Sequence, residues 1–182
     1  KSFIGNYVLG TGFILSFRKF KYLVKQNTKN EEVIFPYLNG KDLNTQCDTT
    51  PTRYVINFGE KTLLDAKRYA EPFSIVETKV KPERIKKSDK ASRKSWWIHA
   101  RPRPNLYTAI RDLNRVLVLA QVSKTTAFSF VPKGWVYDSK LIVFAYETYY
   151  DFAVLQSGIH CHWAWKYGTT MKNDLSYGPY RI

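Results

Sequence analysis

The amino-acid sequence predicts a mixed α/β (α+β) fold: a twisted mixed sheet of about five or six strands flanked by about four or five helices. Short apolar runs rich in β-branched residues alternate with segments of helical periodicity. Their order does not follow a regular strand–helix–strand repeat, so a doubly wound nucleotide-binding fold is not expected. The chain has 182 residues, of which 44% are hydrophobic and 16% aromatic, which suffices for one domain with its own core.

The first part of the chain contains short elements bounded by glycines and capping residues. Ser16 is placed to cap a basic helix that runs to about Gln26. Asn39-Gly40 is a strong turn signal. Strands are expected at residues 12–15, 32–38 and 53–58.

Prolines divide the next segment, which has helical periodicity. A helix is expected from Gly59 to about Ala70, where Pro72 ends it. A second helical piece is expected at residues 73–79, with Pro82 breaking or restarting it. The middle of the chain is therefore predicted to form two short helices.

The second half of the chain contains the most apolar strand candidate. Residues 115–122 (RVLVLAQV) form a nearly continuous apolar run, which is typical of a strand buried on both faces. The other expected elements are a helix capped by Asn105 that ends near Leu113, strands at 127–131 and 140–145 with a Pro132-Lys133-Gly134 turn between them, a longest helix at 149–166, and an element at 177–182 that is cut short.

Positive charge is concentrated in one part of the chain. The formal net charge is +14, and residues 79–103, here called the basic segment, hold ten Lys or Arg against two acidic residues. A folded domain gains nothing from crowding like charges, whereas a polyanion would neutralise them, and nucleic acid is the favoured partner. The predicted phosphate contacts are Lys81, Arg84, Lys86, Lys87, Lys90, Arg93, Lys94, Arg101 and Arg103. Trp96 and Trp97 lie in the same segment and are expected to be core or packing residues, with stacking on bases as the alternative.

Other polyanionic or acidic partners need to be weighed, because basic domains also bind acidic proteins and anionic membranes. A membrane is disfavoured, since Pro82, Pro102 and Pro104 interrupt any continuous amphipathic helix. No apolar run approaches the roughly 18 residues of a membrane span. A basic protein–protein interaction module stays an alternative to DNA binding.

Catalytic motifs are missing from the sequence. It contains neither a phosphate-binding Gly-Lys-Ser/Thr loop nor a nucleophile elbow, and two cysteines cannot supply a structural zinc site. Asp65, Glu77 and Lys79 have the order of a metal-dependent nuclease core. Such a core needs its Glu and Lys on a strand, whereas these residues fall in stretches expected to be helical. A nuclease is therefore disfavoured and is kept only as an alternative. His160 and His162 point to different faces of a helix and are expected to be structural or to face a partner.

Several motifs follow one another in a specific order along nearly the whole chain. They are Ser2-Phe3-x-Gly5, Gly10-x-Gly12-Phe13, Phe35-Pro36-Tyr37-Leu38-Asn39-Gly40-x-Asp42-Leu43-Asn44, Arg53-x-Val55-Ile56-Asn57-Phe58, Val80-Lys81-Pro82-Glu83-Arg84, Trp96-Trp97, Val122-Ser123 and Leu155-Gln156-Ser157-x-x-His160-x-x-Trp163. This series resembles the target recognition domain of MmeI-like type IIG (type IIL) restriction-modification enzymes. The resemblance implies a single DNA target recognition domain over residues 1–182, as a fragment of a longer chain.

The resemblance also implies a parent protein. In that family one polypeptide carries a nuclease, an adenine-specific DNA methyltransferase that uses S-adenosylmethionine, and this non-catalytic domain, which reads the DNA site. The catalytic parts would lie upstream of Lys1, and the alternative is a parent that lacks the nuclease and is a methyltransferase only. No cofactor is then expected in this fragment; S-adenosylmethionine, with Mg²⁺ if a nuclease is present, is expected for the parent. The expected partners are double-stranded DNA and the upstream methyltransferase domain, in the bacterial cytoplasm.

Base-reading residues follow from the same resemblance. In the family, the stretch just after the Val-Ser pair carries base-reading residues and varies between specificities. Here that stretch is Ser123-Lys124-Thr125-Thr126, called the reader turn below, at the end of the apolar strand. Base readout is expected from these four residues with help from Arg101 and Arg103, and an ordinary hairpin turn is the alternative.

Overall fold

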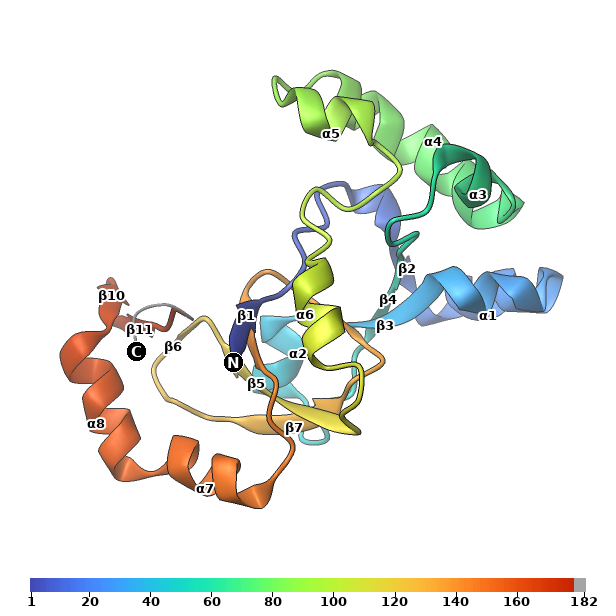
Figure 1. Ribbon diagram of the computed structural model, residues 1–182. Helices are drawn as coiled ribbons and strands as arrows, with labels where there is room; N and C mark the ends of the chain where they lie inside the picture. Colours follow the sequence, from blue (N-terminus) through green and yellow to red (C-terminus); the bar gives the residue numbers. More distant parts are fainter. Residues whose placement is uncertain (179–182) are drawn as a thin grey trace. The chain divides into compact units, whose positions relative to one another are not determined.

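The computed structural model describes residues 1–178 and divides the chain into two compact units (Figure 1). Unit 2 comprises residues 6–37 and 51–102, and unit 1 comprises residues 1–5, 38–50 and 103–182. The predicted element at 177–182 lies largely outside the described residues. The prediction that residues 1–182 form one recognition domain stays a prediction.

Unit 2 is a small antiparallel sheet with helices. The strands β2 (Ile14–Ser16) and β3 (Ile34–Leu38) pair antiparallel on either side of β4 (Arg53–Ile56). The helical elements are η1 (Thr11–Phe13), α1 (Phe17–Gln26), η2 (Thr28–Val33), α3 (Leu63–Lys67), α4 (Ala70–Ile85) and α5 (Lys90–Lys94), where η denotes a 3-10 helix. Ser16 caps α1 as predicted, since its side chain accepts a hydrogen bond from the backbone N–H of Lys19.

Unit 1 contains two antiparallel sheets. One has the strand order β1 (Ser2–Ile4), β9 (Leu141–Phe144), β5 (Arg115–Ala120), β7 (Ser129–Pro132). The other has the order β10 (Thr169–Met171), β11 (Asp174–Ser176), β6 (Val122–Ser123). The remaining elements are α2 (Gly40–Thr45), α6 (Pro104–Ala109), β8 (Val136–Tyr137), α7 (Tyr149–Gln156) and α8 (Gly158–Tyr167).

Strand β5 is the centre of the core of unit 1. Val116, Val118 and Ala120 belong to one buried cluster, and Leu117 and Leu119 belong to another. Because side chains alternate along a strand, these two clusters lie on opposite faces of the sheet. The predicted strand buried on both faces is therefore present, although it ends at Ala120 and β6 begins at Val122.

The mixed α+β class predicted from the sequence is confirmed, but the strands of the described residues lie in three small sheets instead of one. Helix α4 also differs from prediction, because it includes Pro72 in its first turn and continues through Pro82. A proline in the first turn loses no helical hydrogen bond. The exposed Pro82 is tolerated because Val76, Val80 and Arg84 anchor the opposite, buried face.

Two predicted boundaries were wrong for local reasons, and the turn signal at Asn39-Gly40 marks the start of a helix. The Asn39 side chain accepts from the N–H groups of Lys41 and Asp42 and caps α2. Helix α6 begins at Pro104 rather than after Asn105, with the proline in its first turn. The long helix expected at 149–166 is broken at Ser157, whose backbone is extended and whose side chain caps α8.

Candidate nucleic-acid interface

The basic segment forms the end of α4, the short helix α5 and the loops around it. Asp89 starts α5 by accepting from the N–H of Ala91 at 3.1 Å and the hydroxyl of Ser92 at 2.6 Å. These hydrogen bonds, that of Ser92 first, lower the pKa of the Asp89 carboxyl. The exposed cations here are Lys79, Lys86, Lys87, Lys90, Arg93, Lys94 and Arg101. Within residues 1–178, none of these seven side chains has a carboxylate within 4.0 Å, so their charges are available to a ligand.

Lys81 is the half-buried member of the segment. Its Nζ lies 3.0 Å from Glu77 Oε1 and 5.0 Å from the centroid of the Trp96 ring. Trp96 is buried and packs against Phe73, while Trp97 donates its indole N–H to the carbonyl of Lys61 at 3.0 Å. Both tryptophans therefore serve packing, as predicted, and Lys81 already has a partner for its charge.

Arg84 departs from the prediction of a phosphate contact. Its side chain is only 1% exposed, and its Nε and Nη2 donate to the carbonyls of Val8 and Leu9 at 2.8–3.0 Å. Burial lowers the pKa of the guanidinium, and the nearby Asp89 opposes this effect. A buried guanidinium bonded to backbone carbonyls stabilises the chain around it, so Arg84 does not have the exposure that the predicted phosphate contact requires.

Arg101 and Arg103 lie in different units. Arg101 is exposed, and its backbone pairs with that of Tyr7 through two hydrogen bonds of 3.1 Å in unit 2. Arg103 has a left-handed backbone (φ 56°), precedes α6, and its Nε donates to the carbonyl of Gly5 at 3.4 Å in unit 1. Their roles as contacts to DNA stay predictions.

The reader turn joins β6 to β7 in unit 1. Lys124 and Thr125 are exposed and Ser123 is half-buried. Thr126 is only 4% exposed, so its side chain is buried in the fold and does not have the exposure that the predicted contact with a base requires. Lys124 and Thr125 thus offer an ammonium, a hydroxyl and a methyl group to a ligand, which are the groups that read base edges.

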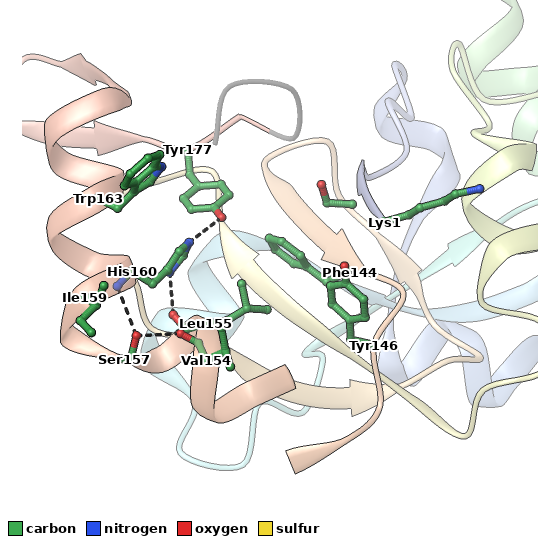
Figure 2. Close-up of a pocket in the computed structure, with 11 residues that line it drawn as sticks. Lys1, Phe144, Tyr146, Val154, Leu155, Ser157, Ile159, His160, Trp163 and Tyr177 are labelled. Atoms are coloured by element: carbon green, nitrogen blue, oxygen red, sulfur yellow. Dashed lines mark hydrogen bonds between the residues drawn. The ribbon is translucent and has the colours of Figure 1, made fainter. Parts of the chain in front are cut away.

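The end of α7 and the start of α8 line a cavity of about 430 Å³ beside Tyr177 (Figure 2). His160 lines this cavity and contacts the carbonyl of Leu155 and the hydroxyl of Tyr177. His162 contacts the carbonyl of Gly158 at 2.7 Å. Both histidines have structural partners, as expected, whereas the pairing of His160 with Tyr177 was not predicted because the two residues belong to separate elements.

His99 is a buried group that the sequence did not reveal. Its Nε2 lies 2.9 Å from the carbonyl of Ile56, which only accepts, so this nitrogen carries the proton and Nδ1 accepts from the Asn6 amide at 3.2 Å. Burial lowers the pKa of His99 to about 4, and the nearby charge of Arg84 acts in the same direction. His99 is therefore neutral in the folded protein at pH 7.

The nuclease alternative finds no support in the geometry. Asp65 lies on α3, where it pairs with Arg68 and accepts from Thr62, and Glu77 on α4 pairs with Lys81. In the described part of the chain, no group of three or more His, Cys, Asp or Glu residues is placed to hold a metal ion. None of the helices described is long and apolar enough to cross a bilayer.

Comparisons with known proteins agree on one relationship. No curated protein sequence matches the chain. The solved structure of the type IIL restriction-modification enzyme MmeI in complex with DNA is similar in fold, with a TM-score of 0.78 and 12% sequence identity. The match covers 100% of this chain and 24% of that chain, so this chain spans about a quarter of that protein's length.

A family model described as MmeI, target recognition domain, matches residues 3–180. The fold and this match define a DNA target recognition module of a restriction-modification enzyme, which is the class predicted from the sequence motifs. The chain belongs to the family of MmeI target recognition domains. The alternatives of a nuclease and of a basic protein–protein interaction module have no support.

Proposed function

We propose that this chain reads a specific sequence of double-stranded DNA for a type IIL restriction-modification enzyme or an adenine-specific DNA methyltransferase. The exposed cations of the basic segment bind phosphates, and the reader turn contacts base edges. The observation that carries this proposal is the group of exposed cations at residues 79–101 that have no carboxylate partner within residues 1–178. Cations without acidic partners are those that neutralise phosphates and release counterions.

The two tasks differ in what they demand of the side chains. Phosphate contacts require only positive charge near the DNA backbone and carry no sequence information. Base contacts require a few donors and acceptors held rigidly at one place in a groove. Lys124 is suited to donate to guanine O6 and N7, and Thr125 offers a hydroxyl and a methyl group.

The parent protein would supply the chemistry. An upstream methyltransferase domain of the same polypeptide would bind S-adenosylmethionine and methylate the site, and a nuclease domain, if present, would use Mg²⁺. This chain holds no catalytic group of its own in the proposal and would act in the bacterial cytoplasm. The MmeI structure with DNA supports DNA as the partner.

The salt dependence of DNA binding tests the proposal. If about six to ten cations contact phosphates, the affinity should fall about 10³–10⁵-fold between 50 and 200 mM salt. Replacing Lys86, Lys87, Lys90, Arg93 and Lys94 together by Gln should reduce the slope of log K against log[salt] by about four to five, with equal losses for all DNA sequences. Fluorescence anisotropy titrations with a labelled duplex would measure both quantities.

A matched variant separates position from total charge. Replacing five exposed lysines outside the basic segment by Gln changes the net charge by the same amount; these are Lys25, Lys41, Lys67, Lys140 and Lys172. This control should retain most of the salt slope. Equal slopes for the two variants, or a flat dependence for the unmodified chain, would contradict the proposed role of the basic segment.

A further inference from the structure

We propose that Gln156, His160 and Tyr177, here called the brace, are positioning residues that fix the reader turn for base discrimination. The inference rests on the proposed function, because it concerns the same turn. All three residues belong to unit 1, as does the turn. The brace residues come from α7, α8 and the segment after β11, so they connect parts of the chain that are distant in sequence.

The reader turn has little internal structure of its own. In the described part of the chain, its one internal hydrogen bond joins the N–H of Thr125 to the hydroxyl of Ser123 at 3.3 Å, which is long for such a bond. Fixing the backbone of each residue costs conformational entropy, which one long hydrogen bond does not offset. The shape of the turn must therefore be held from its two ends.

The first end is held by a strand. Val122 and Ser123 of β6 pair with Ser176 and Leu175 of β11. The pairing is extended by the N–H of Tyr177, which donates to the carbonyl of Gln121 at 2.8 Å. The position at which the chain enters the turn is thereby tied to Tyr177.

The second end is held by the end of α7. The N–H of Phe128 donates to Oε1 of Gln156 at 2.9 Å. The Phe128 ring is buried and lies edge-on to the Tyr177 ring, with centroids 6.2 Å apart, and 5.7 Å from the His160 ring. Gln156 therefore fixes the backbone where the chain leaves the turn, and the aromatic contacts fix the side chain beside it.

His160 joins these two supports (Figure 2). Its Nδ1 lies 2.7 Å from the carbonyl of Leu155, so Nδ1 carries the proton, and in the neutral ring Nε2 accepts from the Tyr177 hydroxyl at 3.1 Å. The Tyr177 hydroxyl is protonated at pH 7 even at the ordinary tyrosine pKa of about 10, and burial raises its pKa further, to about 12. The N–H of His160 also donates to the Ser157 hydroxyl, so the break between α7 and α8 sets the position of His160.

Two histidines on α8 give a matched pair of variants. His160→Asn keeps a donor near the carbonyl of Leu155 but is too short to reach Tyr177. His162→Asn makes the same change at an exposed histidine, whose ring contacts the carbonyl of Gly158 within α8 itself. Gln156→Leu removes the acceptor for the Phe128 N–H, and Gln156→Glu restores an acceptor oxygen at the same length.

Two measurements on the 182-residue chain test the brace. Hydrogen exchange of the amides at residues 123–128 reports how firmly the turn is held. Selection of bound duplexes from a randomised pool reports the preference for the best site over its single-base variants. His160→Asn and Gln156→Leu should each speed exchange in the turn and reduce the site preference about tenfold, with binding to unrelated DNA unchanged. His162→Asn and Gln156→Glu should behave as the unmodified chain does.

The outcomes separate the brace from the proposed function. Unchanged exchange in His160→Asn and Gln156→Leu would overturn the brace and leave the reader turn untouched. Faster exchange with an unchanged site preference would overturn base reading by this turn, and the positioning role would fall with it. A loss of preference in His162→Asn equal to that in His160→Asn would mean that α8 is merely destabilised, which would also overturn the proposal.

Discussion

The basic segment and the reader turn are built in opposite ways. The basic segment presents seven exposed cations on helices and loops of unit 2, which carries 18 basic and 8 acidic residues. The reader turn presents two exposed side chains in unit 1, which carries 11 basic and 7 acidic residues. Binding strength and base discrimination are therefore assigned to separate folded units in the proposed function.

The difference follows from what each contact requires. A long Lys side chain can find a phosphate from many backbone positions, so the cations of α5 need only exposure. A donor to a base edge loses its value when it moves by about an ångström, so the reader turn needs support at both ends. In the proposed function, a surface of high charge and few constraints therefore coexists with a small turn that is held at both ends.

The largest effect is expected for Arg84, the buried cation of the basic segment. Arg84→Met should cost about 3 kcal/mol of unfolding free energy, because the carbonyls of Val8 and Leu9 lose their donors. The salt slope of DNA binding should not change, because Arg84 is buried. Urea unfolding and salt titrations would measure the two effects.

Arg93→Met makes the same substitution at an exposed site and should give the reverse pattern. Its stability should stay within about 0.5 kcal/mol of that of the unmodified chain, and its salt slope should fall by about 0.9. If Arg84→Met reduces the slope as much as Arg93→Met does, Arg84 contacts phosphate and its structural role is wrong.

Acid should weaken unit 2 through His99. The pKa of His99 is lowered to about 4 in the folded protein and is about 6.5 when unfolded. The unfolded chain therefore binds the proton more readily, so the stability that depends on neutral His99 is complete above about pH 6.5. It is lost as the pH falls towards 4, with a total of about 3 kcal/mol.

The variant His99→Gln isolates this contribution, because Gln can donate to the carbonyl of Ile56 but does not titrate. Urea midpoints measured from pH 7.5 to pH 4.5 should fall more steeply for the unmodified chain than for His99→Gln. Parallel curves for the two proteins would show that His99 does not cause the acid sensitivity. Hydrogen exchange of β4, which contains Ile56, would assign the loss to unit 2.

The smallest effect is expected for Lys124 of the reader turn and concerns the preferred DNA sequence. Lys124→Ala should change the preferred DNA sequence and reduce discrimination at one position about tenfold, since a good base contact distinguishes about 1–3 kcal/mol. Lys172→Ala removes an exposed lysine of the same unit, between β10 and β11, and should leave the preference unchanged. Selection from a randomised duplex pool would compare the two.

An unchanged preference with uniformly weaker binding in Lys124→Ala would mean that the turn contacts only the DNA backbone. Base reading would then have to be sought at Arg101 and Arg103. Thr126→Ala is not informative in this test, because Thr126 is buried and its substitution acts on the fold.

Local signals in the sequence were enough to predict several elements. Ser16 predicted the start of α1, because a capping hydroxyl accepts a hydrogen bond from a backbone N–H only three residues away. The apolar run at 115–122 predicted a strand buried on both faces, because burial follows directly from composition. The concentration of positive charge in the basic segment was equally visible, since charge density needs no knowledge of tertiary contacts.

Other features depend on contacts between distant residues. Pro82 was expected to break a helix, but the burial of Val76 and Val80 holds α4 together past it. The carbonyls that bind Arg84 lie about 75 residues earlier in the sequence, so nothing near Arg84 distinguishes it from its exposed neighbours. The same holds for Gln156, whose partner Phe128 precedes it by 28 residues.

Gly12 shows how a residue without a side chain decides where charge is placed. A Cβ at this position would lie 2.6 Å from Cβ of Lys79 and 2.9 Å from Cγ2 of Val80, closer than such atoms approach. Any larger residue must therefore push α4 away, and α4 carries the first cations of the basic segment. In a genetic screen for weakened DNA binding, substitutions at this neutral residue would be recovered together with losses of lysine and arginine.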